Sequence, residues 1–133
     1  MADTIFGKMA RGEFEADFIY EDDHCFAIHD INPQAPVHVL VIPKYEGIPR
    51  LVDAQDSDQE LLGHLMLAVG KIAEQLGVAD AFRLVINNGE GAGQTVFHLH
   101  LHIIAGRTFA EGQMAGFISK SVCQCEAEAK CDR

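Results

Sequence analysis

One segment of the chain alternates histidine with apolar residues. Three of the seven histidines stand at alternate positions, at His98, His100 and His102. Successive side chains of a β-strand point to opposite faces, so the three imidazoles share one face and the apolar residues between them share the other. A row of imidazoles on a buried strand is costly unless its nitrogen atoms have partners or a task. The segment therefore predicts a strand with one apolar face and one face that carries chemistry.

Three interpretations of this row differ in the chemistry that they assign to it. One is a hydrogen-bonded row of surface histidines without a task, although strand surfaces more often carry Thr, Lys or Glu. Another is a metal site, but the outer two Cα atoms of a straight strand lie about 13 Å apart, and zinc requires ring nitrogens within about 2.1 Å. One ion can scarcely bind all three rings, whereas a His-x-His pair with His38 stays open. The third is a catalytic row; His24 and His64 lie outside any motif and are expected to be solvated.

The chemistry of imidazole favours the catalytic interpretation. A central ring that donates from one nitrogen to a backbone carbonyl presents a lone pair on the other nitrogen. Imidazoles on either side can bind an anionic substrate, and cationic neighbours lower the pKa of the central ring, which keeps the lone pair free. Such a nitrogen attacks phosphorus and leaves again, so that one difficult substitution becomes two easier steps. His100 is thus the candidate nucleophile, flanked by two anion binders.

A glycine-rich stretch directly precedes the histidine row. Gly89, Gly91 and Gly93 permit positive φ angles and a close approach of the backbone to a ligand, so that N–H groups can converge on a phosphate. The stretch is not a dinucleotide fingerprint, because a strand follows it instead of a helix. Thr95 adds a hydroxyl group that can protonate or hold a leaving group. These donors support phosphate chemistry beside the candidate nucleophile.

The composition indicates one globular domain that does not bind large polyanions. The 133 residues are 48% hydrophobic and 23% charged, and the formal net charge is −10. Binding to long nucleic acids or anionic membranes relies on Lys and Arg, so this charge argues against both classes of partner. It is compatible with a mononucleotide, which a few backbone N–H groups can hold. The first residues lack the pattern of a signal peptide, and no apolar run is long enough to span a bilayer.

The four cysteines favour a reducing, cytoplasmic location. Cys25 stands alone, and the other three crowd into the last eleven residues, which is a poor framework for disulfides. These three are Cys123, Cys125 and Cys131. We expect a domain over residues 1–111 and a polar tail over residues 112–133. The tail cysteines could bind a metal, but loose cysteines in a polar tail more often have no specific role.

Apolar periodicity and turn residues predict an α+β domain. A short helix is expected over residues 4–11, and a long one begins at a capping box formed by Ser57 and Glu60 and ends at Gly77. Five strands are expected over residues 18–21, 25–29, 37–42, 82–87 and 96–104. The short connections between them indicate an antiparallel sheet, with the long helix on one face.

Five segments of the chain, in the same order, resemble the histidine triad (HIT) family. They begin at Asp3, His29, His38, Gly93 and Gly106. The fourth includes the family signature His-φ-His-φ-His-φ-φ, where φ is an apolar residue, and the similarity is closest to the purine nucleoside phosphoramidase branch, the histidine triad nucleotide-binding proteins. The resemblance implies a five-stranded antiparallel sheet with one long and one short helix. It also implies a homodimer that pairs an edge strand and the long helix across a two-fold axis, giving a ten-stranded sheet.

The resemblance further implies a role for each matching residue. His100 takes up the nucleoside monophosphate, His98 and His102 support it, and His38 is a fourth, remote histidine of the site. Asp30 accepts hydrogen bonds from the ribose hydroxyls. The residues implied to line the base pocket are Ile5, Phe6, Met9, Ile28, His29 and Ile31. Those implied to hold the phosphate and the leaving group are Asn87, Gly93, Gln94 and Thr95.

By this resemblance the chain hydrolyses the P–N bond of purine nucleoside 5′-phosphoramidates, adenosine 5′-monophosphoramidate first, and releases AMP or GMP. The reaction passes through a nucleotidyl-histidine intermediate and needs no metal or cofactor. The alternatives are a dinucleoside polyphosphate hydrolase and a non-catalytic nucleotide-binding or scaffold protein. Two departures from the family leave the leaving group open. Thr95 stands where the branch commonly has Ser, and the tryptophan- and proline-bearing end that should follow Arg107 is missing, since the chain has no Trp.

Overall fold

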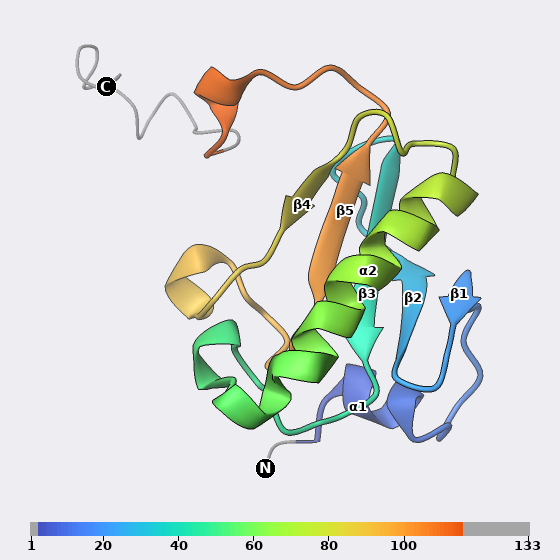
Figure 1. Ribbon diagram of the computed structural model, residues 1–133, viewed down its shortest axis with the longest axis vertical. Helices are drawn as coiled ribbons and strands as arrows, with labels where there is room; N and C mark the ends of the chain where they lie inside the picture. The colour runs from blue at the N-terminus through green and yellow to red at the C-terminus, as the bar shows by residue number, and fades with distance from the viewer. Residues whose placement is uncertain (1–2, 116–133) are drawn as a thin grey trace.

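The chain folds into a five-stranded antiparallel sheet with a long helix on one face and a short helix on the other (Figure 1). The computed structural model describes residues 3–115. The strands follow the spatial order β1-β2-β3-β5-β4, and all neighbouring pairs are antiparallel. The strands are β1 (Tyr20–Glu21), β2 (Cys25–His29), β3 (Val37–Pro43), β4 (Arg83–Val85) and β5 (Leu101–Ala105). This architecture confirms the α+β class and the five-stranded sheet predicted from the sequence.

The predicted tail is described only in its first four residues, 112–115. The tail cysteines, and with them the suggestion that they bind a metal, lie outside the described residues. No helix within residues 3–115 is long and apolar enough to cross a bilayer.

The long helix α2 (Gln59–Gln75) packs across one face of the sheet (Figure 1). Its buried residues Leu65, Val69 and Ile72 share one core with the apolar residues of β3 and β5 that point toward the helix. Apolar side chains recur every 3.6 residues along the helix and at every second residue along the strands, so each element turns one apolar side toward this core. The helix is followed by Gly77, whose φ of +77° suits a glycine after a helix end.

The start of α2 differs from the prediction. A 3-10 turn, η2 (Asp56–Asp58), precedes the helix, and the carboxylate of Asp58 accepts a hydrogen bond from the backbone N–H of Gln55 at 2.9 Å. Ser57 therefore lies inside this turn instead of capping α2, and the helix begins at Gln59. The capping pair is thus Gln55 and Asp58, two residues before the predicted pair of Ser57 and Glu60.

The second face of the sheet is only partly covered. The short helix α1 (Ile5–Ala10) begins after Thr4, whose hydroxyl accepts a hydrogen bond from the backbone N–H of Gly7 at 2.9 Å. The small buried cluster on this face consists of Phe6, Phe26, Ile28, Leu40 and Ile42. Because α1 is only six residues long, it leaves neighbouring parts of β3 and β5 open to a pocket.

The histidine row enters the sheet only at its end. β5 begins at Leu101 instead of residue 96, and residues 96–98 form a bend. The N–H of Leu99 donates to the carbonyl of Ile48 at 2.9 Å, so this part of the chain pairs with a loop and not with a strand. The alternation persists through the bend, since Leu99 and Leu101 lie in the core under α2 while the ring of His100 contacts Phe6 on the opposite face.

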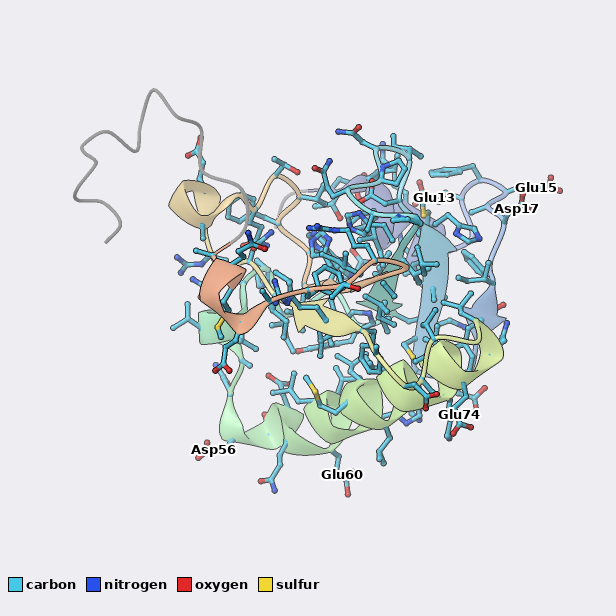
Figure 2. All side chains as sticks on the ribbon, turned by 90° about the horizontal axis from the view of Figure 1, so that it is seen from above. Glu13, Glu15, Asp17, Asp56, Glu60 and Glu74 are labelled. Atoms are coloured by element: carbon cyan, nitrogen blue, oxygen red, sulfur yellow. The ribbon has the colours of Figure 1, made fainter. Side chains whose placement is uncertain are left out.

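The surface carries the excess of acidic residues. Figure 2 shows carboxylates that project outward from the region of α2 and from the segment between α1 and β1. The labelled and exposed side chains are Glu13, Glu15, Asp17, Asp56, Glu60 and Glu74. These side chains carry part of the formal net charge of −10.

Candidate active site

A pocket of about 460 Å³ opens on the face of the sheet that carries α1. One side of it is apolar, and the other holds Asp30 close to His38, His100 and His102. Eleven of the residues implied by the family resemblance line it: Ile5, Phe6, Met9, Ile28, His29, Asp30, Ile31, His38, Thr95, His100 and His102. Larger hollows, of about 720 Å³ beside Phe14 and Lys44 and of about 820 Å³ beside His24 and His64, have no member of the histidine row in their walls. The smaller pocket is therefore the candidate active site.

The backbone fixes the tautomer of His100. Its Nδ1 lies 2.7 Å from the carbonyl oxygen of His98, and a carbonyl oxygen only accepts, so Nδ1 carries the proton. The neutral ring then has its lone pair on Nε2, for which no hydrogen bond is formed within residues 3–115. The ring also packs edge-on against Phe6, with centroids 5.0 Å apart.

The pKa of His100 is lowered from its ordinary value, and the cause differs from the one expected. Burial of the ring lowers the pKa, while the hydrogen bond to the His98 carbonyl and the negative charge of Asp30 raise it in part. Burial, and not the cationic neighbours invoked from the sequence, keeps the ring neutral. A neutral His100 at pH 7 holds an available lone pair, as a nucleophile requires.

A chain of hydrogen bonds fixes the tautomer of His102 as well. The backbone N–H of Gln34 donates to Nδ1 of His38 at 3.0 Å, so His38 carries its proton on Nε2. That Nε2 lies 2.9 Å from Nδ1 of His102, which must therefore accept. The remaining proton of His102 is on Nε2, and this atom is buried without a partner in the described part of the chain. An unsatisfied buried donor beside a pocket is a site prepared for an acceptor.

The His102 ring is neutral as well as oriented. Burial lowers its pKa to about 4, with further lowering by the positive charge that His100 and His38 can carry. Nε2 of His38 also lies 3.3 Å from a carboxylate oxygen of Asp30, and this carboxylate accepts the backbone N–H of Asn32 through its other oxygen at 2.7 Å. The site thus offers an oriented N–H dipole, rather than a full positive charge, to a bound anion.

His98 has a different environment from the other two members of the row. Its Nε2 donates to the carbonyl of Pro43 at 2.8 Å, the side chain is buried, and it does not line the pocket. The ring ties the bend before β5 to the end of β3, and the backbone carbonyl of the same residue holds His100. The structure therefore places His98 behind the pocket, where it orients the neighbouring histidine.

The glycine-rich stretch contributes less to the pocket than its sequence suggests. Gly93 has a φ of +99° and closes the 3-10 turn η3 (Glu90–Ala92). The Gln94 amide is buried: it donates to the carbonyls of Pro49 at 2.7 Å and Val96 at 3.0 Å, and accepts the N–H of Gly89 at 2.8 Å. The Gln94 side chain thus braces the loop and has no free N–H for a phosphate.

The structure brings only part of the implied phosphate group to the pocket. Thr95 lines it, whereas Asn87, Gly93 and Gln94 do not. Asn87 lies beside the turn, with its Nδ2 3.8 Å from where a Cβ of Gly93 would stand. Four pocket residues were missed from the sequence: Asn32, Gln34, Leu40 and Val96. The role of Gln34 comes from its backbone N–H, which no side-chain pattern reveals, although the prolines on either side of this loop mark it as rigid.

Two groups of side chains within residues 3–115 have a composition that suits a metal ion. One is Asp30, His38 and His102 in the pocket. The Gln34 N–H donates to Nδ1 of His38, so the proton of that ring is on Nε2, and this nitrogen has no lone pair for a metal ion while the hydrogen bond is kept. This group is therefore a hydrogen-bond relay. The other group lies under α2 and includes His64. The sequence predicted a solvated His64 ring, whereas the structure shows this residue half-buried.

The sequence and the fold place the chain in a known family. Residues 11–109 match the HIT domain, and the chain belongs to the HIT family. It is 58% identical over 108 residues to an uncharacterised HIT-like protein of Synechocystis sp., covering 81% of this chain and 94% of the relative. A relative of the same description from Synechococcus elongatus is 55% identical over 108 residues, with the same coverage.

Solved structures agree with this assignment. A HIT family hydrolase from Legionella pneumophila superposes with a TM-score of 0.77 at 40% identity, covering 82% of this chain and 97% of that one. A histidine triad nucleotide-binding protein from Candida albicans superposes with a TM-score of 0.67 at 30% identity, covering 76% of this chain and 73% of that one. The family and fold inferred from the five sequence segments are confirmed.

Proposed function

We propose that this chain is a nucleotidyl hydrolase that cleaves the P–N bond of purine nucleoside 5′-phosphoramidates. The observation that carries the proposal is the pairing of two fixed tautomers in one pocket. His100 has its lone pair on Nε2, and His102 has an unpartnered N–H on Nε2. One group attacks phosphorus and the other binds the phosphoryl oxygen. The similarity to solved HIT family hydrolases supports the reaction class.

The first step transfers the nucleotidyl group to His100. Nε2 attacks the phosphorus, the P–Nε2 bond forms, and the P–N bond of the substrate breaks. The amine leaves after taking up one proton, and we assign the hydroxyl of Thr95, a residue of the pocket wall, as its donor. Positive charge develops on the His100 ring and is stabilised by the His98 carbonyl that holds its Nδ1–H.

The second step returns the enzyme to its starting state. A water molecule attacks the phosphorus and gives one proton back to the Thr95 oxygen, the P–Nε2 bond breaks, and the nucleoside monophosphate leaves with the oxygen of that water. The sum is one water consumed, with one amine and one monophosphate released. Both transition states carry extra negative charge on the phosphoryl oxygens, and the oriented N–H of His102 is worth most when that charge peaks.

The rest of the pocket suits a nucleoside. Phe6, Met9 and Ile28 form an apolar wall on which a purine ring can lie, and Asp30 offers carboxylate oxygens to ribose hydroxyls. Ile31 is fully exposed and Ile5 is half-exposed, so these two stand at the rim of the pocket. The separation of an apolar end from a histidine end sets the direction in which a nucleotide enters.

We also propose a homodimer and a cytoplasmic location. β4 is a terminal strand of the sheet, so one of its edges is open, and Met66 and Leu67 of α2 are exposed apolar side chains. An open strand edge beside an apolar helix surface is a suitable place for a second copy of the chain. The family resemblance implies the same pairing. Sedimentation at micromolar concentration is expected to give twice the monomer mass, and a monomer mass would contradict this proposal.

Turnover of two substrates separates the proposed function from its alternatives. Adenosine 5′-phosphoramidate and a diadenosine polyphosphate are each incubated with the full chain, with and without a chelator, and AMP release is measured. We expect a higher kcat/KM for the phosphoramidate and no effect of the chelator. A preference for the dinucleotide would identify a dinucleoside polyphosphate hydrolase. Tight AMP binding without turnover of either substrate would identify a nucleotide-binding or scaffold protein.

A further inference from the structure

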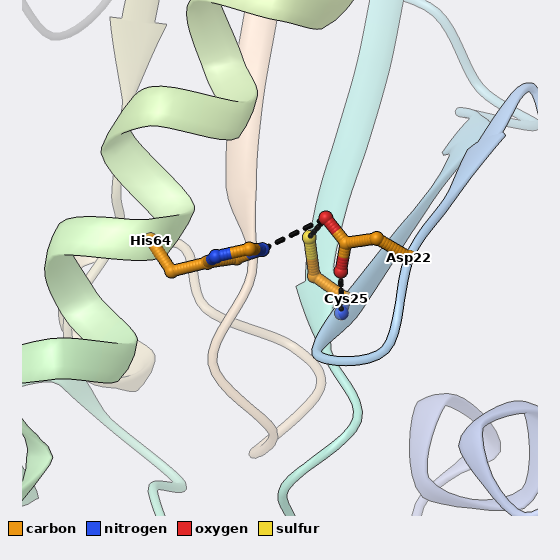
Figure 3. Close-up of side chains that lie close together, drawn as sticks. All are labelled: Asp22, Cys25 and His64. Carbon is orange, nitrogen blue, oxygen red and sulfur yellow. Dashed lines mark hydrogen bonds and ion pairs between the residues drawn. The ribbon is translucent and has the colours of Figure 1, made fainter.

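A second group of reactive side chains lies on the opposite face of the sheet from the pocket, under α2. Figure 3 shows His64 reaching from α2 toward Asp22, in the turn between β1 and β2, and Cys25, at the start of β2. Nε2 of His64 lies 2.8 Å from Oδ2 of Asp22, and Sγ of Cys25 lies 3.7 Å from the same oxygen. All three ligand atoms lie within 4.8 Å of one another.

The backbone orients the Asp22 carboxylate toward the other two residues. Its Oδ1 accepts the N–H groups of His24 and Cys25 at 2.8 and 2.9 Å, which closes the turn. This leaves Oδ2 to face Cys25 and His64, and the hydroxyl of Tyr20 supports Oδ2 with a hydrogen bond of 2.9 Å. A ligating carboxylate held by an outer hydrogen bond in this way is typical of metal sites in proteins.

We propose that Asp22, Cys25 and His64 form a zinc site that joins α2 to the turn between β1 and β2. A carboxylate, a thiolate and an imidazole are the three ligand types that Zn²⁺ takes in proteins. One Asp and one Cys together supply two negative charges, which neutralise the ion in a partly buried position. The fourth ligand is water or the exposed ring of His24, whose centroid lies 4.8 Å from that of His64.

The distances between the ligand atoms are close to those of a filled site. Ligands of a tetrahedral zinc ion lie roughly 3.3 to 3.6 Å apart, so binding requires movements of about 1 Å or less. The ion can enter from the surface, because the side chains of Asp22 and His64 are 25% and 32% exposed. His64 and His24 also line a hollow of the surface, while Cys25 is fully buried and forms the inner end of the site.

Binding exchanges protons for the ion in a balanced way. Burial and the nearby Asp22 charge raise the pKa of Cys25 to about 12, so the free thiol keeps its proton and loses it to solvent only when Zn²⁺ replaces it. Although burial acts to raise it, the His24 amide and the His64 ring hold the pKa of Asp22 well below its usual range. A His64 ring that binds the ion through Nε2 carries its proton on Nδ1. The Cys25 thiol releases one proton for each ion bound.

Cobalt substitution tests the site, because a thiolate bound to Co²⁺ gives a charge-transfer absorption that no other ligand here produces. The full chain is prepared, under reducing conditions, with Cys123, Cys125 and Cys131 changed to Ser, which leaves Cys25 as its only thiol. We expect one Co²⁺ per chain with this absorption, and its displacement by Zn²⁺. Absence of the band, or its persistence after Cys25→Ser, would overturn the proposal.

Three further variants keep the test decisive if Cys25→Ser does not fold. His64→Gln removes a ligand from the surface of α2 and should weaken Zn²⁺ binding by more than the roughly 10- to 100-fold that loss of an outer partner costs. Tyr20→Phe removes only the outer hydrogen bond and should fall within that range. His38→Gln, in the pocket on the other face, should leave the affinity unchanged. Equal Zn²⁺ affinity in His64→Gln and the parent would contradict the assignment, as would a melting temperature of the parent that does not rise with Zn²⁺.

Discussion

Replacement of His38 should invert the tautomer of the neighbouring His102. In His38→Leu, Nδ1 of His102 loses the N–H that it accepts. The Asp30 carboxylate is then the nearest partner, since the ligand atoms of Asp30, His38 and His102 all lie within 4.8 Å of one another. A carboxylate accepts only, so it draws the proton of His102 from Nε2 to Nδ1. Nε2 then presents a lone pair, instead of an N–H, to the phosphoryl oxygen.

The size of the effect follows from the strength of the new hydrogen bond. A hydrogen bond to a charged group contributes about 1.5 to 3 kcal/mol, and this free energy now favours the unproductive tautomer. We therefore expect kcat for the phosphoramidate to fall roughly 10- to 150-fold, with a smaller change in KM. His38→Gln is the matched control, because its amide N–H can occupy the position of the His38 Nε2–H and keep His102 in its productive form.

Steady-state kinetics and ¹⁵N NMR of the His102 ring test this relay together. In His38→Leu the protonated ring nitrogen is expected to change from Nε2 to Nδ1, and in His38→Gln it should not. The Gln variant should retain at least several-fold more activity than the Leu variant. Equal loss of kcat in both variants, with an unchanged His102 tautomer, would refute the relay from Gln34 through His38.

Three other predictions concern pH, the loop and α1. The pKa of His102 falls from its ordinary value of 6.5 to about 4 in the folded chain, so the unfolded chain binds more protons than the folded chain between these two pH values. The free energy of unfolding, measured by urea titration, should therefore decrease as the pH falls from about 6.5 to 4. A free energy that does not change over this range would contradict the burial of His102. Gln94→Ala leaves two carbonyls and one N–H without their partner and should destabilise the fold by about 2 to 3 kcal/mol. Gln59→Ala, at an exposed position, is the control and should leave the stability nearly unchanged. Arg11 pairs with Asp3 and Glu46 at the end of α1. Arg11→Ala should raise KM for the nucleotide more than it lowers kcat. A larger fall in kcat than rise in KM would mean that α1 does not position the base.

The alternation in the sequence carried much of the structural prediction. It separated Leu99 and Leu101, which lie under α2, from His100 and His102, which face the pocket, and this holds even where β5 has not yet begun. Periodicity depends on side-chain burial, which the amino-acid order records well. The element boundaries were less accurate, since the start of α2 depends on one carboxylate in the preceding turn.

Three features of the site could not be inferred from the sequence for a physical reason. Gln94 resembled a phosphate ligand, but its amide satisfies three backbone groups of its own loop, which only the folded backbone reveals. The backbone N–H of Gln34 fixes His38, and a backbone group leaves no trace in residue identity. The pKa of His100 was expected to fall through neighbouring charge, whereas burial, which depends on long-range packing, is the main cause.

Trapping of the covalent intermediate tests the proposed role of His100. The full chain is mixed with radiolabelled adenosine 5′-phosphoramidate, quenched in alkali within one turnover, digested and analysed by mass spectrometry. We expect one adenylyl group on the peptide that contains His98, His100 and His102, with fragmentation assigning it to His100. His100→Asn should form no adduct and release no AMP, while still binding AMP. An adduct on another residue, or AMP release by His100→Asn, would contradict the mechanism.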